Sequence, residues 1–325
     1  MTHAMRIHAI GGPEVLSWED VPVGAPAAGE VRLRHTAIGV NFVDVYYRTG
    51  VYPPPGGFPM IPGAEAAGVV EALGPGVIDL RPGDRVVYQG STGAYAEERL
   101  IAADRLVKLP DDIDEQVAAA SFLKGLTVQC LLRRTFKVGK GTVLLWHAAA
   151  GGVGSMACQW AAALGATVIG TVGSDEKIDL ARANHCSHVI NYRKEDFVKR
   201  VKEFTGGVGV DVVYDSVGKD TFPGSLDCLK PMGMWVSFGQ SSGVPPPFPV
   251  SVLQQKGSLF ATRPTIFHYL ARRGDLEAST AELFAALRGG LVRVDVNLEL
   301  SLKDAAEAHR ALESRKSVGA IVLLP

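Results

Sequence analysis

The sequence predicts a two-domain α/β protein, in which a mostly β domain precedes a doubly wound parallel sheet of six strands. Short strands separated by Gly and Pro turns fill roughly the first 120 residues. Along residues 30–38, for example, Val31 and Leu33 alternate with polar side chains. From Val143 onward, strand and helix patterns alternate, which is typical of a parallel sheet covered by helices. A chain of 325 residues is long enough for both domains.

The composition is that of an ordinary water-soluble enzyme. Hydrophobic residues make up 47% of the chain, charged residues make up 21%, and the formal net charge is −1. Because no block of Lys and Arg stands out, we expect neither a nucleic acid nor a membrane as the main partner. The N-terminus lacks a signal-peptide core and no segment reads as a membrane span, so a cytoplasmic location is expected. The cysteines form no CxxC pair and are expected to be packed free thiols: Cys130, Cys158, Cys186 and Cys228.

The elements of the second domain can be predicted in order. A helix is expected over residues 118–136, where apolar residues recur at helical spacing before Gly139 and Gly141. A strand begins at Val143, and helices such as that expected over residues 196–204 separate most of the strands that follow. The further strands are expected at residues 167–172, 188–192, 210–215, 234–238 and 258–262.

The end of the chain is expected to return to the first domain. Helices are predicted over residues 276–287 and 302–313, the second opened by Ser301 with Asp304 in capping-box spacing. An apolar strand is predicted at residues 320–324. A strand that follows a complete sheet is best placed elsewhere, so ligands are expected in a cleft between two domains. The predicted domains are residues 1–122 with 265–325, and residues 123–264.

The junction after the Val143 strand predicts a nucleotide site. The spacing Ala149-x-Gly151-Gly152-x-Gly154 is a variant of the dinucleotide fingerprint, in which small residues let the backbone approach a pyrophosphate at a helix N-terminus. The alternative is a tight strand-to-helix turn that binds nothing. The preceding strand, the following helix and the later strands favour the nucleotide.

The end of the next strand indicates which nucleotide is bound. An NAD site usually has a carboxylate there to bond the ribose 2′-hydroxyl. Here Gly173 leaves room for a 2′-phosphate, Ser174 can donate to it, and Lys177 supplies positive charge, which favours NADPH. Asp175 and Glu176 argue the other way, but as first-turn residues of a helix they are expected to complement its dipole.

Motifs along the whole chain resemble those of the medium-chain dehydrogenase/reductase superfamily, and in particular its zinc-free, zeta-crystallin-like quinone oxidoreductases. The resemblance implies a GroES-like catalytic domain, a Rossmann domain, and an activity similar to that of bacterial NADPH:quinone reductases. The motifs lie at residues 11–16 (GGPEVL), 39–44 (GVNFVD), 52–55 (YPPP), 62–68 (PGAEAAG), 83–86 (GDRV), 148–154 (AAAGGVG), 191–192 (NY), 215–218 (DSVG) and 238–239 (FG).

The positions that hold zinc in other members of this superfamily have changed here. Asn41 stands in place of the expected Cys and Ala64 in place of the His, although Glu65 remains. The lobe with four cysteines is also missing. We therefore expect catalysis without metal. A quinone is already electrophilic, so hydride transfer to it can depend on positioning alone.

The resemblance places four catalytic candidates near the nicotinamide: Asn41, Asp44, Tyr46 and Tyr52. Asn41 could orient the carboxamide or a quinone oxygen, and a tyrosine could donate to developing negative charge. Each has a purely structural alternative, because Asn41 could cap a helix, Asp44 could be solvated, and the tyrosines could be core aromatics.

The resemblance also implies a set of cofactor contacts, most of them at strand ends, where a parallel sheet binds ligands. Thr127 is preferred to Lys124, whose side chain could be solvated. The set is Asn41, Thr127, Gly152, Val153, Gly173, Ser174, Lys177, Tyr192, Ser216, Phe238, Gly239, Ser241 and Arg263.

Two other functions stay open. A reductase of activated alkenes such as enones or alkenals would use the same fold, and relatives similar to zeta-crystallin suggest an NADPH-binding structural or RNA-associated protein. Near-neutral charge argues against RNA as the main ligand. The strand at residues 258–262 is expected at a sheet edge, where pairing with a second subunit would give a homodimer.

Overall fold

The computed structural model describes residues 2–314 and 319–325, which form two compact units. One unit comprises Met1–Lys124 and Val294–Pro325, and the other comprises Gly125–Arg293. The first boundary lies close to the expected one. The second boundary lies at Arg293 rather than at residue 264.

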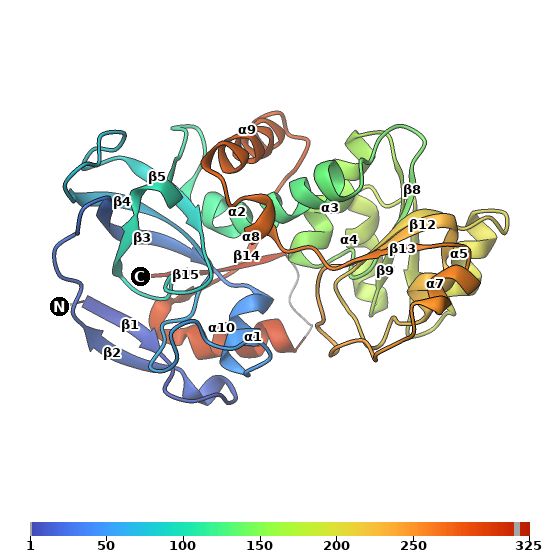
Figure 1. Cartoon of the computed structure of the whole chain (residues 1–325), viewed down its shortest axis with the longest axis horizontal. Helices are drawn as coiled ribbons and strands as arrows, with labels where there is room; N and C mark the ends of the chain where they lie inside the picture. The colour runs from blue at the N-terminus through green and yellow to red at the C-terminus, as the bar shows by residue number, and fades with distance from the viewer. Residues whose placement is uncertain (1, 315–318) are drawn as a thin grey trace. The chain divides into compact units, whose positions relative to one another are not determined.

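The first unit is built on a seven-stranded sheet in the order β14-β15-β3-β4-β5-β7, with β6 paired to β3. The β3–β4, β4–β5, β3–β6 and β15–β3 pairs are antiparallel, and β14 pairs parallel with β15. Figure 1 shows the C-terminal strand in the same unit as the N-terminal strands, where β15 pairs with β3. The elements are β1 (Thr2–Arg6), β2 (Ser17–Val21), β3 (Glu30–Gly39), α1 (Phe42–Arg48), β4 (Glu65–Leu73), β5 (Arg85–Gln89), β6 (Glu98–Ala102), β7 (Val107–Lys108), β14 (Val296–Ser301), α10 (Ala305–Glu313) and β15 (Ala320–Leu324).

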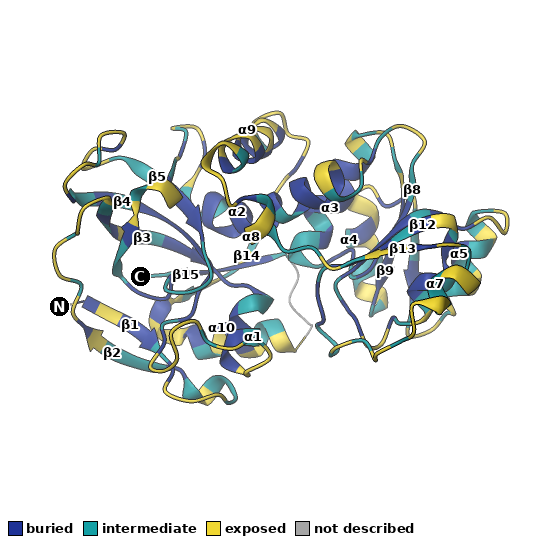
Figure 2. Cartoon of the chain, viewed as in Figure 1, coloured by how far each residue is buried: buried dark blue, intermediate teal, exposed yellow. Residues whose placement is uncertain are grey.

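The alternation read from residues 30–38 produces the core of this unit. Val31 and Leu33 on β3 are fully buried, and they pack with Val70 of β4 and Val86 of β5. Buried residues follow the strands, while exposed residues follow the turns (Figure 2). The alternation therefore gives β3 one face toward the core, as period-two patterning predicts.

Helices α1 and α10 are joined at their C-terminal ends. The guanidinium of Arg48 is fully buried, donates to Gly11 O at 3.1 Å, and pairs with Glu313 at 2.7 Å. An unpaired buried guanidinium would be costly, so this ion pair ties α1 to α10 across more than 260 positions of sequence.

The second unit contains the six-stranded sheet that the sequence predicts. Its order is β10-β9-β8-β11-β12-β13 and every pair in it is parallel. This is the doubly wound order, with successive strands added outward on both sides of β8 and β11. The elements are β8 (Val143–Trp146), α3 (Gly152–Ala163), β9 (Thr167–Val172), α4 (Ile178–Ala183), β10 (His188–Asn191), α5 (Phe197–Phe204), β11 (Val210–Asp215), α6 (Gly224–Asp227), β12 (Leu229–Ser237), α7 (Ser251–Gln255), β13 (Phe260–Thr262), α8 (Ile266–Tyr269) and α9 (Arg273–Arg288).

Helix α9 explains why the second unit extends beyond residue 264. A Cβ added at Gly125 would stand 2.4 Å from the side chain of Leu283, so the helix lies directly on the chain at Gly125. Arg134 bonds Asp275 at 3.1 Å, and Gln159 exchanges two hydrogen bonds with the backbone of Arg293. These contacts join α9 and the residues after it to the parallel-sheet unit. Sequence periodicity finds the helix but not its partner.

Two local predictions also need correction. Helix α2 (Glu115–Gln129) begins earlier than residue 118, because Asp114 accepts hydrogen bonds from the backbone N–H groups of Gln116 and Val117. Its last turns, Cys130–Thr135, are π-helical. Ser301 precedes a 3₁₀ turn and makes no side-chain cap hydrogen bond, so the capping box expected with Asp304 does not form.

Candidate active site

The predicted cofactor contacts of the second unit lie at one edge of its sheet. Parallel strands all end at the same edge, and ligands bind beside the point where strand order reverses, here between β8 and β11. The last residues of β9, β10, β11 and β12 are buried, whereas most residues just beyond them are partly exposed. Residues following five of the strands are Gly173, Ser174 and Lys177 after β9, Tyr192 after β10, Ser216 after β11, Phe238, Gly239 and Ser241 after β12, and Arg263 after β13.

The glycine turn places a helix N-terminus at this edge. Helix α3 begins at Gly152, directly after the extended residue Gly151, so the backbone N–H groups of its first turn lack helical partners. A Cβ at Gly154 would stand 2.3 Å from the carbonyl oxygen of Ala148, so only glycine allows the helix this close to the strand. Gly152 and Val153 are partly exposed there. Such a turn suits an anion on the helix axis.

Gly173 and Tyr192 are neighbours across the ends of β9 and β10. A Cβ at Gly173 would stand 2.9 Å from the Tyr192 hydroxyl oxygen. The Asp175 carboxylate already has partners, because it accepts a hydrogen bond from the Asn191 amide at 2.6 Å and pairs with Lys194. Lys177 is about half-buried, and burial lowers the pKa of its ammonium. Positive charge held in a partly dehydrated place is what a phosphate site requires.

The loops after β11 and β12 pack on each other. A Cβ at Gly239 would meet the Ser216 backbone at 2.8 Å, and the Ser241 N–H donates to Ser216 O at 3.1 Å. The ring of Phe238 lies 5.4 Å from that of Trp146. Arg263 holds the second loop by donating to Gly239 O at 3.1 Å and to Gln240 Oε1 at 2.9 Å. Arg263 therefore braces this loop.

The Asp215 carboxylate holds the loop after β11 in place through hydrogen bonds. It is fully buried and accepts hydrogen bonds from the Val217 and Gly218 N–H groups, at 2.9 and 3.0 Å. Burial by itself would raise the pKa of Asp215, but nearby His147 and the hydrogen bonds from Gly218 and two hydroxyls outweigh burial and lower it. The further side-chain donors are Thr221, Ser225 and Trp235.

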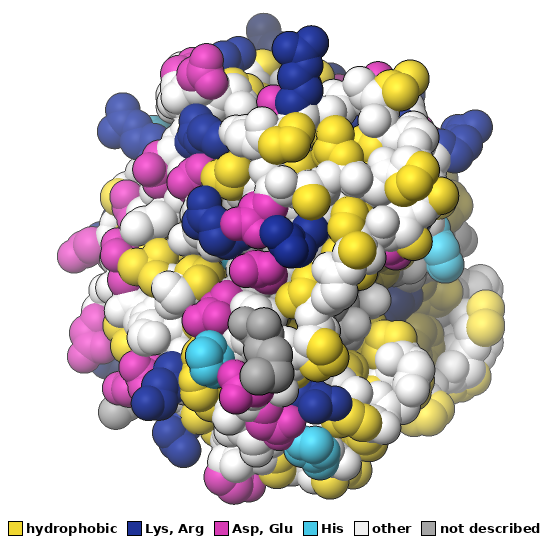
Figure 3. Space-filling view, turned by 90° about the vertical axis from the view of Figure 1, so that its left-hand side faces the viewer, with side chains coloured by type: hydrophobic (Ala, Val, Ile, Leu, Met, Phe, Trp, Pro, Cys, Tyr) yellow, Lys and Arg dark blue, Asp and Glu magenta, His cyan; other side chains and the backbone are white. Residues whose placement is uncertain are grey.

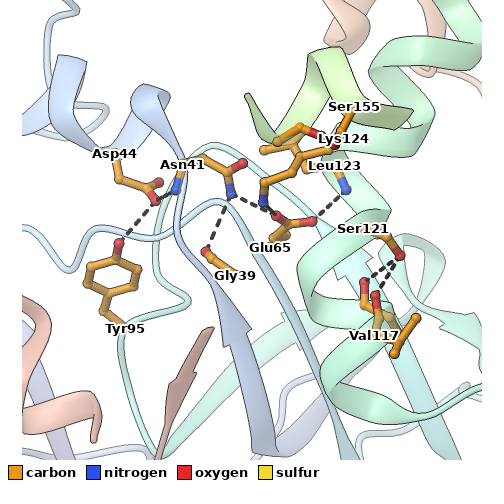
Figure 4. A network of polar contacts seen from close by, with 12 residues as sticks. Gly39, Asn41, Asp44, Glu65, Tyr95, Val117, Ser121, Leu123, Lys124 and Ser155 are labelled. Atoms are coloured by element: carbon orange, nitrogen blue, oxygen red, sulfur yellow. Dashed lines mark hydrogen bonds and ion pairs between the residues drawn. The ribbon is translucent and has the colours of Figure 1, made fainter. Parts of the chain in front are cut away.

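In the first unit, the structure joins Asn41 to a buried ion pair that sequence reasoning missed (Figure 4). The Asn41 amide donates to Glu65 Oε1 at 2.8 Å, and the Lys124 ammonium donates to the same oxygen at 2.7 Å. Glu65 is fully buried and Lys124 nearly so, so the alternative that Lys124 is solvated is wrong. Gly39 has to be glycine, because a Cβ there would stand 2.4 Å from Glu65 Oε1 and 2.1 Å from Ala119 O.

Asp44 is also fully buried, so the alternative that it is solvated is wrong. Its Oδ2 accepts from the Asn41 N–H at 2.8 Å and from the Tyr95 hydroxyl at 3.1 Å. Burial raises the pKa of Asp44 to about 7, despite these two donors. His309 Nε2 lies 3.0 Å from the Tyr95 oxygen, and burial lowers the pKa of His309 to about 3. Tyr95 uses its proton on Asp44, so neutral His309 donates to it through Nε2.

The remaining candidates are partly exposed. The rings of Tyr46 and Tyr52 meet edge to face at 5.3 Å, and both side chains are partly exposed. Thr127 lies on α2 and is partly exposed. The four catalytic candidates thus fall into two contacting pairs, Asn41 with Asp44 and Tyr46 with Tyr52.

A local signal existed for two of the missed residues. Glu65 and Lys124 are lone charges within apolar stretches, at residues 64–70 and 118–126. A charge in such a setting is buried only when it is paired. Tyr95 and His309 carried no comparable signal, since they are 214 positions apart.

Across residues 2–314 and 319–325, no group of three or more His, Cys, Asp or Glu side chains could hold a metal ion. The same residues include no helix that is long and apolar enough to cross a membrane. The four cysteines are buried and unbridged, as expected.

Comparison with known proteins agrees with this arrangement. Two family models match the chain, the alcohol dehydrogenase GroES-like domain over residues 27–111 and the zinc-binding dehydrogenase domain over residues 152–285. The quinone oxidoreductase of Salmonella typhimurium is 51% identical over 328 residues, covering 100% of each chain. The 2-haloacrylate reductase of a Burkholderia species is 48% identical, covering 100% of this chain and 99% of that enzyme.

A solved structure extends the match to three dimensions. The crystal structure of Escherichia coli quinone oxidoreductase complexed with NADPH has a TM-score of 0.97 and 48% identity, covering 99% of this chain and 100% of that chain. The resemblance seen in the motifs is thereby confirmed over the full length. The chain belongs to the medium-chain dehydrogenase/reductase superfamily and, within it, to the quinone oxidoreductases.

Proposed function

We propose that this protein is an NADPH-dependent quinone reductase. The observation that carries the proposal is the full-length match to the Escherichia coli quinone oxidoreductase complexed with NADPH. The predicted cofactor contacts of the second unit, lying at and beside the ends of its parallel strands, support it independently.

The residues present fit NADPH. The first turn of α3 offers N–H groups to the pyrophosphate, and the close approach at Gly154 keeps that turn in place. Ser174 and Lys177 hold the 2′-phosphate, while Asp175 is kept away from it by Asn191 and Lys194. Tyr192 and Phe238 flank the adenosine and nicotinamide parts, and Ser216, Gly239 and Ser241 line the loops between them. Bound NADPH supplies a hydride from its nicotinamide C4.

The chain's own residues do the positioning in this proposal. Tyr46 and Tyr52 donate hydrogen bonds to the quinone oxygen on which negative charge develops. No metal is required, because Asn41 and Ala64 stand at the positions of the zinc ligands and the Asn41 amide is bonded to Glu65. We also propose a cytoplasmic homodimer that pairs through β13, the edge strand of the parallel sheet.

The test is anaerobic oxidation of NADPH, followed by its absorbance, with 1,4-benzoquinone, a naphthoquinone and an enone as acceptors and NADH as the parallel cofactor. Rapid reduction of the quinones with NADPH and slow reduction with NADH is the expected result, without added metal and in the presence of a chelator. Lys177→Gln should weaken NADPH binding about tenfold and leave NADH unchanged, because it removes a charge-assisted contact to the 2′-phosphate.

A reductase of activated alkenes is the second candidate, favoured by the 48% identity to the Burkholderia 2-haloacrylate reductase. Turnover of the enone or of 2-chloroacrylate, with none of either quinone, would select it.

An RNA-associated role has less support. On the face drawn in Figure 3, basic and acidic side chains are interspersed. Among the ion pairs of the described residues, Arg34 pairs with Glu71 at 3.1 Å, and Arg6 pairs with Glu19 at 3.1 Å. Binding driven by phosphate contacts requires unopposed basic stripes. Retention on RNA at moderate salt without any reductase activity would favour that role.

A further inference from the structure

The buried ion pair of Glu65 and Lys124 fixes which way the Asn41 amide faces. Glu65 accepts three hydrogen bonds, from the Lys124 ammonium, from the Asn41 amide, and from the Leu123 N–H at 2.6 Å. An ionised carboxylate has no proton to donate, so only the Nδ2 group of Asn41 can face it. The second Nδ2 proton points toward Gly39 O at 3.4 Å. Both amide protons are therefore directed into the protein.

The oxygen of the same amide keeps acceptor capacity. An amide oxygen has two lone pairs. The Asp44 N–H donates to the main-chain oxygen of Asn41 at 3.1 Å and also closes a capping box onto the Asn41 side chain, so one of the two lone pairs of Oδ1 remains for a ligand. Asn41 is 8% exposed, whereas Glu65 is fully buried. A ligand that reaches Asn41 thus meets a hydrogen-bond acceptor rather than a donor.

This orientation discriminates between the two ligands of the proposed reaction. An oxidised quinone has only acceptor oxygens, while the nicotinamide carboxamide carries an NH₂ group that can donate. We propose, on the basis of the function proposed above, that Glu65 and Lys124 are positioning residues that turn Asn41 Oδ1 toward the NADPH carboxamide. Asn41 then orients the cofactor and does not bind the quinone oxygen.

Lys124 acts through Glu65. Its ammonium balances the charge of the Glu65 carboxylate, and without it this buried charge would be unpaired. A neutral residue at position 65 that can donate as well as accept, such as Gln, would let the Asn41 amide turn over. The two residues therefore set the direction of the Asn41 hydrogen bond without touching the cofactor.

The experiment compares NADPH with its 3-acetylpyridine analogue, in which a methyl group replaces the carboxamide NH₂. Dissociation constants of both are measured without quinone. The wild type should bind NADPH about fivefold to tenfold more tightly than the analogue, the worth of one hydrogen bond. Asn41→Ala, Glu65→Gln and the double variant Glu65→Gln/Lys124→Met should each bring this ratio near one. The double variant leaves no unpaired buried charge, so it is the one expected to fold most reliably.

The matched control is Glu71→Gln, which removes a partly exposed, arginine-paired carboxylate from the same strand β4. Its ratio should equal that of the wild type, and 2′,5′-ADP should bind all variants equally. A wild-type ratio near one, or a ratio that Glu65→Gln and the double variant leave unchanged, overturns the inference even if quinone reduction is normal. A fivefold to tenfold preference of the wild type for NADPH over the analogue, together with its loss in the variants, would support the inference even if no quinone were reduced.

Discussion

Asp44 in the first unit and Asp215 in the second are equally buried aspartates whose pKa values are shifted in opposite directions. Neither side chain has any exposed surface. Burial raises the pKa of Asp44 to about 7, whereas the pKa of Asp215 lies below its usual value. Burial alone therefore does not decide whether an acid in this protein is charged.

The difference lies in the donors around each carboxylate. Asp215 precedes a turn whose N–H groups point back at it, and three side chains add their protons. Asp44 lies in the first turn of α1 and receives only the Asn41 N–H and the Tyr95 hydroxyl, both on Oδ2. Its Oδ1 is buried without a hydrogen-bond partner. His147 beside Asp215 and the hydrogen bonds to its charged form together outweigh burial, whereas the two donors of Asp44 do not.

The largest effect is expected from Asp215→Ala, which should lower the free energy of unfolding by about 5 kcal/mol. The Thr221 and Ser225 hydroxyls have backbone carbonyls as second acceptors. The Val217 and Gly218 N–H groups and the Trp235 indole would lose their partner. Chemical denaturation measures the loss. The control Asp179→Ala removes an exposed carboxylate and should change stability by less than about 0.5 kcal/mol.

Asp44→Asn should change how stability depends on pH. The folded pKa of about 7 lies above the unfolded value of 3.8, so between these values the folded state holds a proton that the unfolded state has lost. Wild-type stability therefore falls as pH rises through this window, and the Asn variant lacks this contribution. From pH 4 to pH 8, the wild type should lose up to about 4 kcal/mol relative to the variant.

The measured quantity is the difference in unfolding free energy between the wild type and Asp44→Asn, because other groups titrate in the same pH range. The side chain at position 44 is surrounded in both proteins by Lys124, Glu65, Tyr95 and His309. Free energies of unfolding measured at several pH values for both proteins give the difference directly. A difference that is constant from pH 4 to pH 8 would mean that Asp44 is ionised throughout, and the contrast with Asp215 would disappear.

The sequence predicts what depends on local pattern. The six strands and the glycine turn before α3 follow from alternation, spacing and turn residues, and the structure confirms the strands. Most of the groups at the strand ends are implied by the resemblance to a family instead. The fully buried Asp215 was recognised only as part of a motif, because the aspartate at the end of a strand does not reveal how many donors will surround it.

Pairings between distant residues could not be predicted. Glu65 and Lys124 are 59 positions apart, and the packing of α9 in the second unit depends on contacts such as that of Leu283 with the chain at Gly125. Whether a lone charge such as Lys124 is solvated or paired is decided by which strand lies opposite it. Helical periodicity carries no information on that choice, so the sequence leaves open whether Lys124 is solvated.

Thr221→Val tests one donor of Asp215 at nearly constant shape. The Thr221 hydroxyl donates to the two carboxylate oxygens at 2.9 and 2.8 Å. Its loss should cost about 2 kcal/mol, because the acceptor is charged. Thr49→Val removes a hydroxyl that donates to the neutral Val45 carbonyl at 2.8 Å and should cost about half as much. Equal costs for the two variants would argue that Asp215 is not ionised.

Tyr95→Phe should have the smallest effect and one that depends on pH. The Tyr95 hydroxyl stabilises the charged form of Asp44, so removing it should raise the pKa of Asp44 further above 7. The variant should lose about 1 kcal/mol more at pH 8.5 than at pH 5.5, because only the ionised carboxylate gains from a charge-assisted bond. In Asp44→Asn this extra loss should vanish, since there is no charge to stabilise. An equal loss at both pH values would show that Tyr95 contributes through packing and its bond to His309, and that donors near Asp44 do not control its charge.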